Sequence, residues 1–174
     1  MAKARDIGRR MRSVQSTRKI TRTMEMVATS KLRRAQSQVR EARPFAERLT
    51  AVVENLVTPE LADLEPLLRQ PDRIRRAAVI LVTSNRGLCG AFNVNLIRKA
   101  RALLAELEAS DVETEFHVIG KKGISYFRFR NVEMATRRTD IGDSPSPDEA
   151  RSLIDPLAER FVGEDLDAVY VVHA

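Results

Sequence analysis

The sequence is poor in the residues that carry redox, metal and stacking chemistry. Among 174 residues it has one cysteine, Cys89, and no tryptophan, and aromatic residues make up only 5% of the chain. A lone cysteine excludes an internal disulfide and is typical of a reducing compartment. The longest apolar run, residues 77–82, is far shorter than the ~20 residues of a membrane-spanning helix. The N-terminus lacks the apolar core of a secretory signal, so we expect a bacterial product without a targeting peptide.

Catalytic and metal-binding patterns are scarce too. His117, His173 and Cys89 have no second ligand at metal spacing, and no nucleophile has a base at a recognisable spacing. The Gly-containing loop at residues 85–90 matches neither of the two phosphate-binding glycine patterns, and we assign Gly87 and Gly90 to the turn and to close helix packing. The sequence therefore predicts no catalytic residue, no cofactor and no metal.

What the sequence does have is a long helical repeat. Over residues 4–57, mostly apolar side chains recur at alternating strides of four and three, the pattern of a coiled-coil seam. A helix of that extent is roughly 75–80 Å long, whereas a compact domain of this chain length has a radius of gyration of ~16 Å. The helix must then find a partner for its seam outside its own domain. The seam residues are Ile7, Met11, Val14, Leu32, Val39, Leu49, Val53 and Leu56.

The seam fails between residues 18 and 28. Polar side chains occupy its positions there, while four apolar residues turn to other faces: Ile20, Met24, Met26 and Val27. A helix that is apolar on several sides is normally enclosed, so this segment is expected to lie inside a protein sleeve; an imperfect coiled-coil layer is the alternative. Pro44 predicts a kink or short break near Arg43.

The positive charge is concentrated in the same helix. Residues 1–43 contain 13 Lys or Arg and three acidic residues, a net charge of +10, so the rest of the chain carries −4 of the total of +6. This distribution favours an acidic partner, either nucleic acid or acidic protein loops, over a merely solvated basic face. Phe45 is the only aromatic residue before Val57, which leaves almost no platform for stacking on bases.

The remainder of the chain has the pattern of an α/β domain. Strands are predicted at 77–82, 115–119, 132–136 and 168–172, and helices at 92–108, 124–130 and 147–162. Ser146 and Glu149 form a capping-box pattern at the start of the last helix. The expected fold class is therefore α/β: a long N-terminal coiled-coil helix over 1–57, a linker over 58–75, and a small, mostly parallel, Rossmann-like domain over 76–174. A strand so close to the chain end suggests that the sequence continues in the native protein.

Two segments resemble one known family. The run Thr17-Arg18-Lys19-Ile20-Thr21 with Met24-Glu25-Met26-Val27-Ala28 resembles the amino-terminal helix of the gamma subunit of F-type ATP synthases. The run Arg86-Gly87-Leu88-Cys89-Gly90, followed by Asn93 and Asn95, resembles the loop after that family's first strand. The similarity extends over the whole chain, although the family's second long helix, which completes its coiled coil, has no counterpart here.

The resemblance implies a rotor. A gamma subunit is a non-catalytic central stalk that couples proton flow through the membrane ring to ATP synthesis in the catalytic head. Its partners are the alpha and beta subunits, the epsilon subunit and the ring of c subunits, on the cytoplasmic side of the bacterial plasma membrane, which it meets only through the ring. The alternative is a nucleic-acid-binding protein with a basic arm.

The resemblance also implies which residues meet those partners. The helix would contact the alpha and beta subunits through Arg9, Arg10, Arg12, Lys19, Ile20, Arg22, Met24, Met26 and Val27. The domain would offer a foot loop, which packs within the domain or against epsilon or the ring and consists of Asn85, Arg86, Gly87, Leu88, Cys89 and Gly90.

Overall fold

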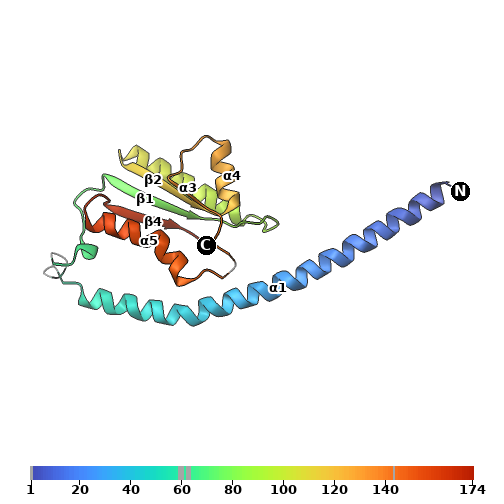
Figure 1. Cartoon of the computed structure of the whole chain (residues 1–174), viewed down its shortest axis with the longest axis horizontal. Coiled ribbons are helices and arrows are strands. Elements are labelled where there is room, and N and C mark those ends of the chain that lie inside the picture. Colours follow the sequence, from blue (N-terminus) through green and yellow to red (C-terminus); the bar gives the residue numbers. More distant parts are fainter. Residues whose placement is uncertain (1, 59–60, 62–63, 143) are drawn as a thin grey trace. The chain divides into compact units, whose positions relative to one another are not determined.

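A computed structural model describes residues 2–58, 61, 64–142 and 144–174 and confirms the expected fold class. The chain divides into two compact units, residues 1–56 and 57–174 (Figure 1). The first is a single helix, α1, Ala2–Leu56. The second contains η1 (Pro66–Leu68), β1 (Arg76–Val82), α3 (Phe92–Ala109), β2 (Glu113–Ile119), α4 (Lys121–Phe129), β3 (Thr136–Arg138), α5 (Pro147–Val162) and β4 (Ala168–Val172).

The helix α1 continues through Pro44, so of the two predicted alternatives near Arg43, a kink or a short break, the break does not occur. Proline removes one backbone donor, which leaves the carbonyl of Arg40 without its helical partner. Because Arg40 and its neighbours are exposed, water can satisfy that carbonyl. Pro44 therefore destabilises the long helix too little to interrupt it.

The second unit is built around a parallel sheet with the strand order β3-β2-β1-β4. β1 lies in the middle, and its residues 77–81 are at most 1% exposed. Helices α3 and α4 cover one face, where Phe127 packs edge-on against Phe116 with ring centroids 4.7 Å apart. Helix α5 covers the other face through Leu157 (Figure 1). Burial on both faces is why residues 77–82 of β1 are all apolar rather than apolar at alternate positions.

The third strand is shorter and later than the predicted 132–136. Helix α4 ends at Phe129; beyond it Asn131 has a φ of 55°, and the amide of Val132 donates to the carbonyl of Phe127 at 3.0 Å. Residues 131 and 132 thus cap the helix in a Schellman-type turn and are not free to join the sheet. Pairing with β2 begins only at Thr136.

Helix α4 also begins earlier than predicted, at Lys121 rather than at Ile124. The side-chain oxygen of Asn85 accepts a hydrogen bond from the Lys121 amide at 3.0 Å. The first turn of α4 is therefore capped by a residue 36 positions away in the sequence, a contact that no local pattern could reveal.

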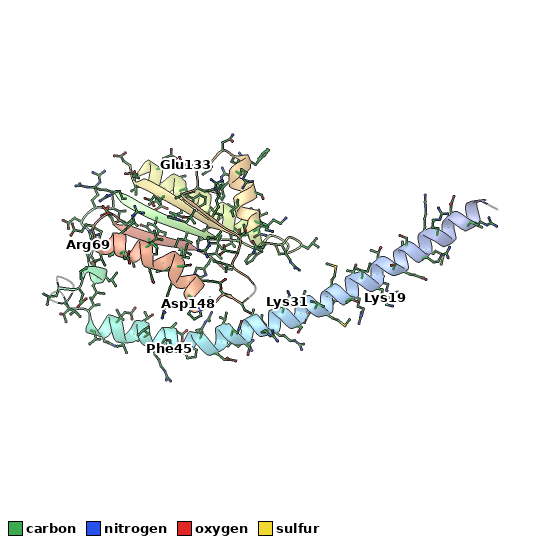
Figure 2. All side chains as sticks on the ribbon, viewed as in Figure 1. Lys19, Lys31, Phe45, Arg69, Glu133 and Asp148 are labelled. Carbon is green, nitrogen blue, oxygen red and sulfur yellow. The ribbon has the colours of Figure 1, made fainter. Side chains whose placement is uncertain are left out.

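The segment before β1, which falls in the predicted linker 58–75, contacts the domain. Arg69 (labelled in Figure 2) donates to the carbonyl of Phe161 at 3.2 Å and to that of Leu166 at 2.8 Å, and its guanidinium lies 4.9 Å from the Phe161 ring centre. The carboxylate of Asp167 accepts from the amides of Arg75 and Arg76. These contacts hold the end of the segment against the turn after α5. Residues 59–60 and 62–63 of the predicted linker lie outside the described residues.

Candidate functional site

The first candidate surface is the apolar seam of α1. Its eight predicted residues, from Ile7 to Leu56, are 42 to 67% exposed. A solitary helix cannot cover its own apolar stripe, and burying each of these side chains against a partner is worth about 1 kcal/mol. The seam is thus exposed along the described part of α1, and its role as a coiled-coil interface stays a prediction.

A second apolar stripe lies on α1 where the seam is interrupted. At 100° per residue, Ile20, Met24 and Val27 stand at positions i, i+4 and i+7 and share one face. The seam positions of the same segment, Arg18, Thr21 and Glu25, face the opposite side, while Met26 points to a third direction. All four apolar side chains are more than half exposed. Segment 18–28 therefore offers apolar groups in several directions at once.

The predicted cationic contacts do not form a single stripe. The helix brings Arg9, Arg12 and Lys19 to one face, but it turns Arg10 and Arg22 to others. All of these side chains are exposed, and Figure 2 shows Lys19 extending away from the ribbon. The sequence predicts that these contacts are positively charged, but it does not show how the charges are distributed around the helix. Positive charge surrounds the first half of α1, which suits neighbours on all sides rather than one flat partner.

Three threonine hydroxyls in this part of α1 are bonded within the helix. The side chains of Thr17, Thr21 and Thr23 donate to backbone carbonyls one turn earlier, at 3.0, 2.9 and 3.0 Å. A hydroxyl bonded in this way needs no donor or acceptor on a partner, so it costs little to bury against an apolar surface. The sequence predicts no role for these hydroxyls, although Thr17 and Thr21 belong to the run that carries the family resemblance.

The second candidate surface is the loop between β1 and α3, at the carboxyl edge of the sheet. Asn85 is a structural member of this loop, because its amide nitrogen donates to the carbonyls of Thr139 at 3.3 Å and Ile141 at 3.2 Å. Thr83, which the sequence did not single out, is buried and donates to the carbonyl of Ile119 at 2.9 Å while it accepts from the amide of Gly123 at 2.9 Å. The base of the loop is therefore rigid.

The tip of the loop, residues 86–90, is exposed throughout. Leu88 is 96% exposed and has a φ of 62°, a left-handed conformation that is costly for a residue with a Cβ. Gly90 has a φ of 57°, a left-handed conformation that suits its assignment to the turn. Gly87 does not have a positive φ, and a Cβ there would lie 3.4 Å from the side chain of Lys122 on α4. The strained backbone belongs to Leu88 instead, which is held out where a partner can reach it.

Asn93 fixes the returning side of the loop. Its oxygen accepts from the Ser84 amide at 3.0 Å, and its nitrogen donates to the Ser84 hydroxyl at 2.8 Å and to the sulfur of Cys89 at 3.0 Å. The loop can therefore present a defined shape to a protein partner. It places no base beside Cys89, and the described residues contain no cluster of three or more His, Cys, Asp or Glu side chains that could hold a metal.

The remaining titratable cluster lies under α5. Arg160 donates two hydrogen bonds to Glu115, at 2.7 and 2.6 Å, and they lower the pKa of Glu115 below its usual value. His117 is buried with its Nε2 3.6 Å from Glu115, and burial lowers the pKa of the imidazole. This arrangement stabilises the packing of α5 on the sheet, and His117 is a core histidine rather than a ligand.

Similarity to known proteins covers the whole chain. A family model described as ATP synthase matches residues 3–174. The chain is 53% identical over 174 residues to the ATP synthase gamma chain of Gemmatimonas aurantiaca, 43% identical over 172 residues to that of Leptospira biflexa, and 39% identical over 173 residues to that of Frankia casuarinae. These alignments cover 100, 99 and 97% of this chain.

The chain is shorter than these relatives and spans 60, 60 and 58% of their lengths. Their names give no support to the alternative of a nucleic-acid-binding arm. Among the helices that the structure describes, none combines the length and the hydropathy that crossing a bilayer requires.

Proposed function

Because the chain belongs to the ATP synthase family, and its relatives over its full length are gamma chains, we propose that it acts in the central stalk of an F-type ATP synthase. In this role it performs no bond chemistry. It transmits rotation between a proton-driven ring and the catalytic head, so that proton flow is coupled to ATP synthesis. We assign residues 1–57 to the shaft, 58–75 to a linker and 76–174 to the foot.

The observation that carries the proposal is the surface of α1. Over its 55 residues the helix exposes an apolar seam, and within residues 18–28 it adds a second apolar stripe. Cations surround its first half, and its threonine hydroxyls are bonded to its own backbone. A rotating shaft must meet several neighbours in turn, and such a surface suits that task because it demands no single set of hydrogen-bond partners.

We place the partners according to the charge and position of each surface. The cations of α1 suit acidic loops of the alpha and beta subunits, with Met24 in the enclosed segment, since a flexible thioether adapts to different neighbours. The exposed loop tip at 86–90 is assigned to a neighbouring subunit, epsilon or the c-subunit ring. The chain then reaches the cytoplasmic face of the bacterial plasma membrane only through that ring.

The proposal is tested in the complex from detergent-solubilised membranes of the source cells. Tagged native protein should co-purify with alpha, beta and epsilon subunits identified by mass. Replacing Met24 with Lys places a charge in the enclosed segment, and we expect ATP-driven proton pumping to fall at least roughly twofold relative to ATP hydrolysis.

The matched control for this experiment is Gln38→Lys, which adds the same charge to the same helix outside segment 18–28. We expect pumping close to wild type in that variant. The absence of ATP synthase subunits, or equal coupling in the two variants, would contradict the proposed role.

A further inference from the structure

The domain carries a basic and aromatic patch where α3 and α4 meet. We define the α4 patch as Arg101, Tyr126, Phe129 and Arg130. A guanidinium nitrogen of Arg101 donates to the Tyr126 hydroxyl at 3.4 Å, and the guanidinium of Arg130 lies 5.7 Å from the centre of the Tyr126 ring. Tyr126 and Phe129 lie on α4 and Arg130 is its C-cap residue, so the spacings i, i+3 and i+4 bring the three to one face (α4 in Figure 1).

The base of the α4 patch is rigid and its outer part is open. The Tyr126 ring packs edge-on against the buried Phe127, with ring centroids 5.1 Å apart and an interplanar angle of 81°. Phe129, by contrast, is 83% exposed. An exposed phenylalanine beside a tightly packed tyrosine ring is a typical anchor residue for a protein partner.

The charge of the α4 patch is not neutralised within the described part of the chain. There, no carboxylate pairs with Arg101 or Arg130. Five other arginines of the domain do have a carboxylate within ion-pair distance: Arg69, Arg76, Arg138, Arg151 and Arg160. The two free guanidinium groups therefore offer hydrogen-bond donors to an anionic partner.

We propose that the α4 patch docks an acidic protein surface, whose carboxylates pair with Arg101 and Arg130 and whose apolar pocket receives Phe129. Arginine, tyrosine and phenylalanine are enriched at protein interfaces, and the planar guanidinium matches a carboxylate in two hydrogen bonds. The proposal rests on the proposed function in one respect: the partner is a subunit of the same complex.

A lipid surface is the less suitable partner. Recognition of anionic membranes typically uses clusters of about four to eight Lys or Arg residues. The α4 patch has two cations, both arginine, and they flank a tyrosine that is only partly exposed. The α4 patch offers directional hydrogen bonds and an aromatic side chain of fixed shape. A protein surface can complement these groups, whereas a fluid layer of lipid headgroups cannot.

The test uses the complete complex with a photo-crosslinking amino acid at position 129. Irradiation should yield one adduct, to a single identified subunit, through a peptide rich in Asp or Glu. Replacing Arg130 with Glu should lower the retention of that subunit at least about tenfold. Arg128→Glu is the control, because it places the same charge on α4 away from the patch face, and its effect should stay below about twofold.

Three outcomes would overturn the α4 patch proposal: an adduct to lipid or to a basic surface, no adduct, or equal effects of the two charge reversals. Unchanged thermal unfolding of each variant chain shows that folding is not the cause. If residue 129 faces solvent in a complex that contains the chain, the patch fails and the proposed function stands. If the chain is absent from ATP synthase, the proposed function fails, and the patch is judged by the same crosslink in the assembly that does contain the chain.

Discussion

Helix α1 and strand β1 are both rich in apolar residues, but the strand buries them and the helix exposes them. Residues 77–81 of β1 are at most 1% exposed, whereas the apolar seam of α1 is 42 to 67% exposed. Helices on both faces of the sheet and two neighbouring strands of the same chain explain why β1 is stable. Nothing within the described part of α1 does the same for its seam. The domain therefore buries its own apolar residues, while the apolar seam of α1 stays exposed, and partners for that seam remain a prediction.

The sharpest test of this comparison uses two phenylalanines. Phe127 is 1% exposed and packs against two other rings, whereas Phe45 of α1 is 73% exposed (Figure 2). Phe127→Ala should lower the free energy of unfolding of the domain by about 3–5 kcal/mol, because it leaves a cavity among packed side chains. Phe45→Ala should change it by less than about 0.5 kcal/mol.

Tyrosine fluorescence in urea provides the measurement, because the chain has no tryptophan and its two tyrosines, Tyr126 and Tyr170, both lie in the domain. If the Phe127 and Phe45 variants lost equal free energy of unfolding, α1 would contribute to the folded core of the domain. That result would contradict the contrast between α1 and β1.

A smaller effect is expected from two glycines within the domain. Gly120 has a φ of 97°, and a Cβ there would lie 2.1 Å from the carbonyl oxygen of Thr83. Gly120→Ala should therefore lower the free energy of unfolding by about 2–4 kcal/mol and loosen the base of the loop at 85–90. Gly142→Ala is the control, because its Cβ would meet nothing within 4 Å. Similar unfolding midpoints in urea for the two variants would contradict the rigid base that we describe.

The smallest effect concerns the ion pair under α5. Arg160 holds the pKa of Glu115 below its usual value in the folded state. The contribution of the pair is thus complete above the unfolded pKa and is lost as the pH falls through the folded pKa. Both side chains are more than a third exposed, at 37 and 36%, so solvent screening limits this contribution. We expect Glu115→Gln to cost about 1 kcal/mol at pH 7 and progressively less as the pH falls below the usual glutamate pKa of about 4.3.

Urea unfolding of the Glu115 variant from pH 8 to pH 3 measures this dependence. Glu108→Gln, at an exposed glutamate without a described ion pair, should show no such change with pH. A loss in the Glu115 variant that persists at pH 3 would point to packing rather than charge.

Much of the fold was predictable because its signals are local. The alternating strides of four and three predicted α1 to within two residues at its start, and the apolar run at 77–82 predicted β1. The capping box at Ser146 and Glu149 forms as expected, with the Ser146 amide 2.7 Å from the Glu149 carboxylate. Each of these patterns depends on neighbours a few positions away, which a single sequence displays directly.

The errors arose where residues distant in the sequence meet. The start of α4 is set by Asn85, and the late start of β3 follows from the turn that caps α4. Thr83 gave no sequence signal, because its importance comes from contacts with Ile119 and Gly123. The α4 patch likewise appears only when α3 and α4 pack side by side.

The sequence by itself determined the two-part organisation, the long basic helix and the family resemblance, because periodicity, charge and motif residues are properties of the chain order. Tertiary structure alone decided which loop residues support the domain and which remain exposed. The structure shows that Asn85 is hydrogen-bonded to three backbone groups, whereas Leu88 is exposed and has a positive φ. The physical reason is that hydrogen bonding and burial depend on the neighbours that the folded chain brings together, and those neighbours lie tens of residues away in the sequence.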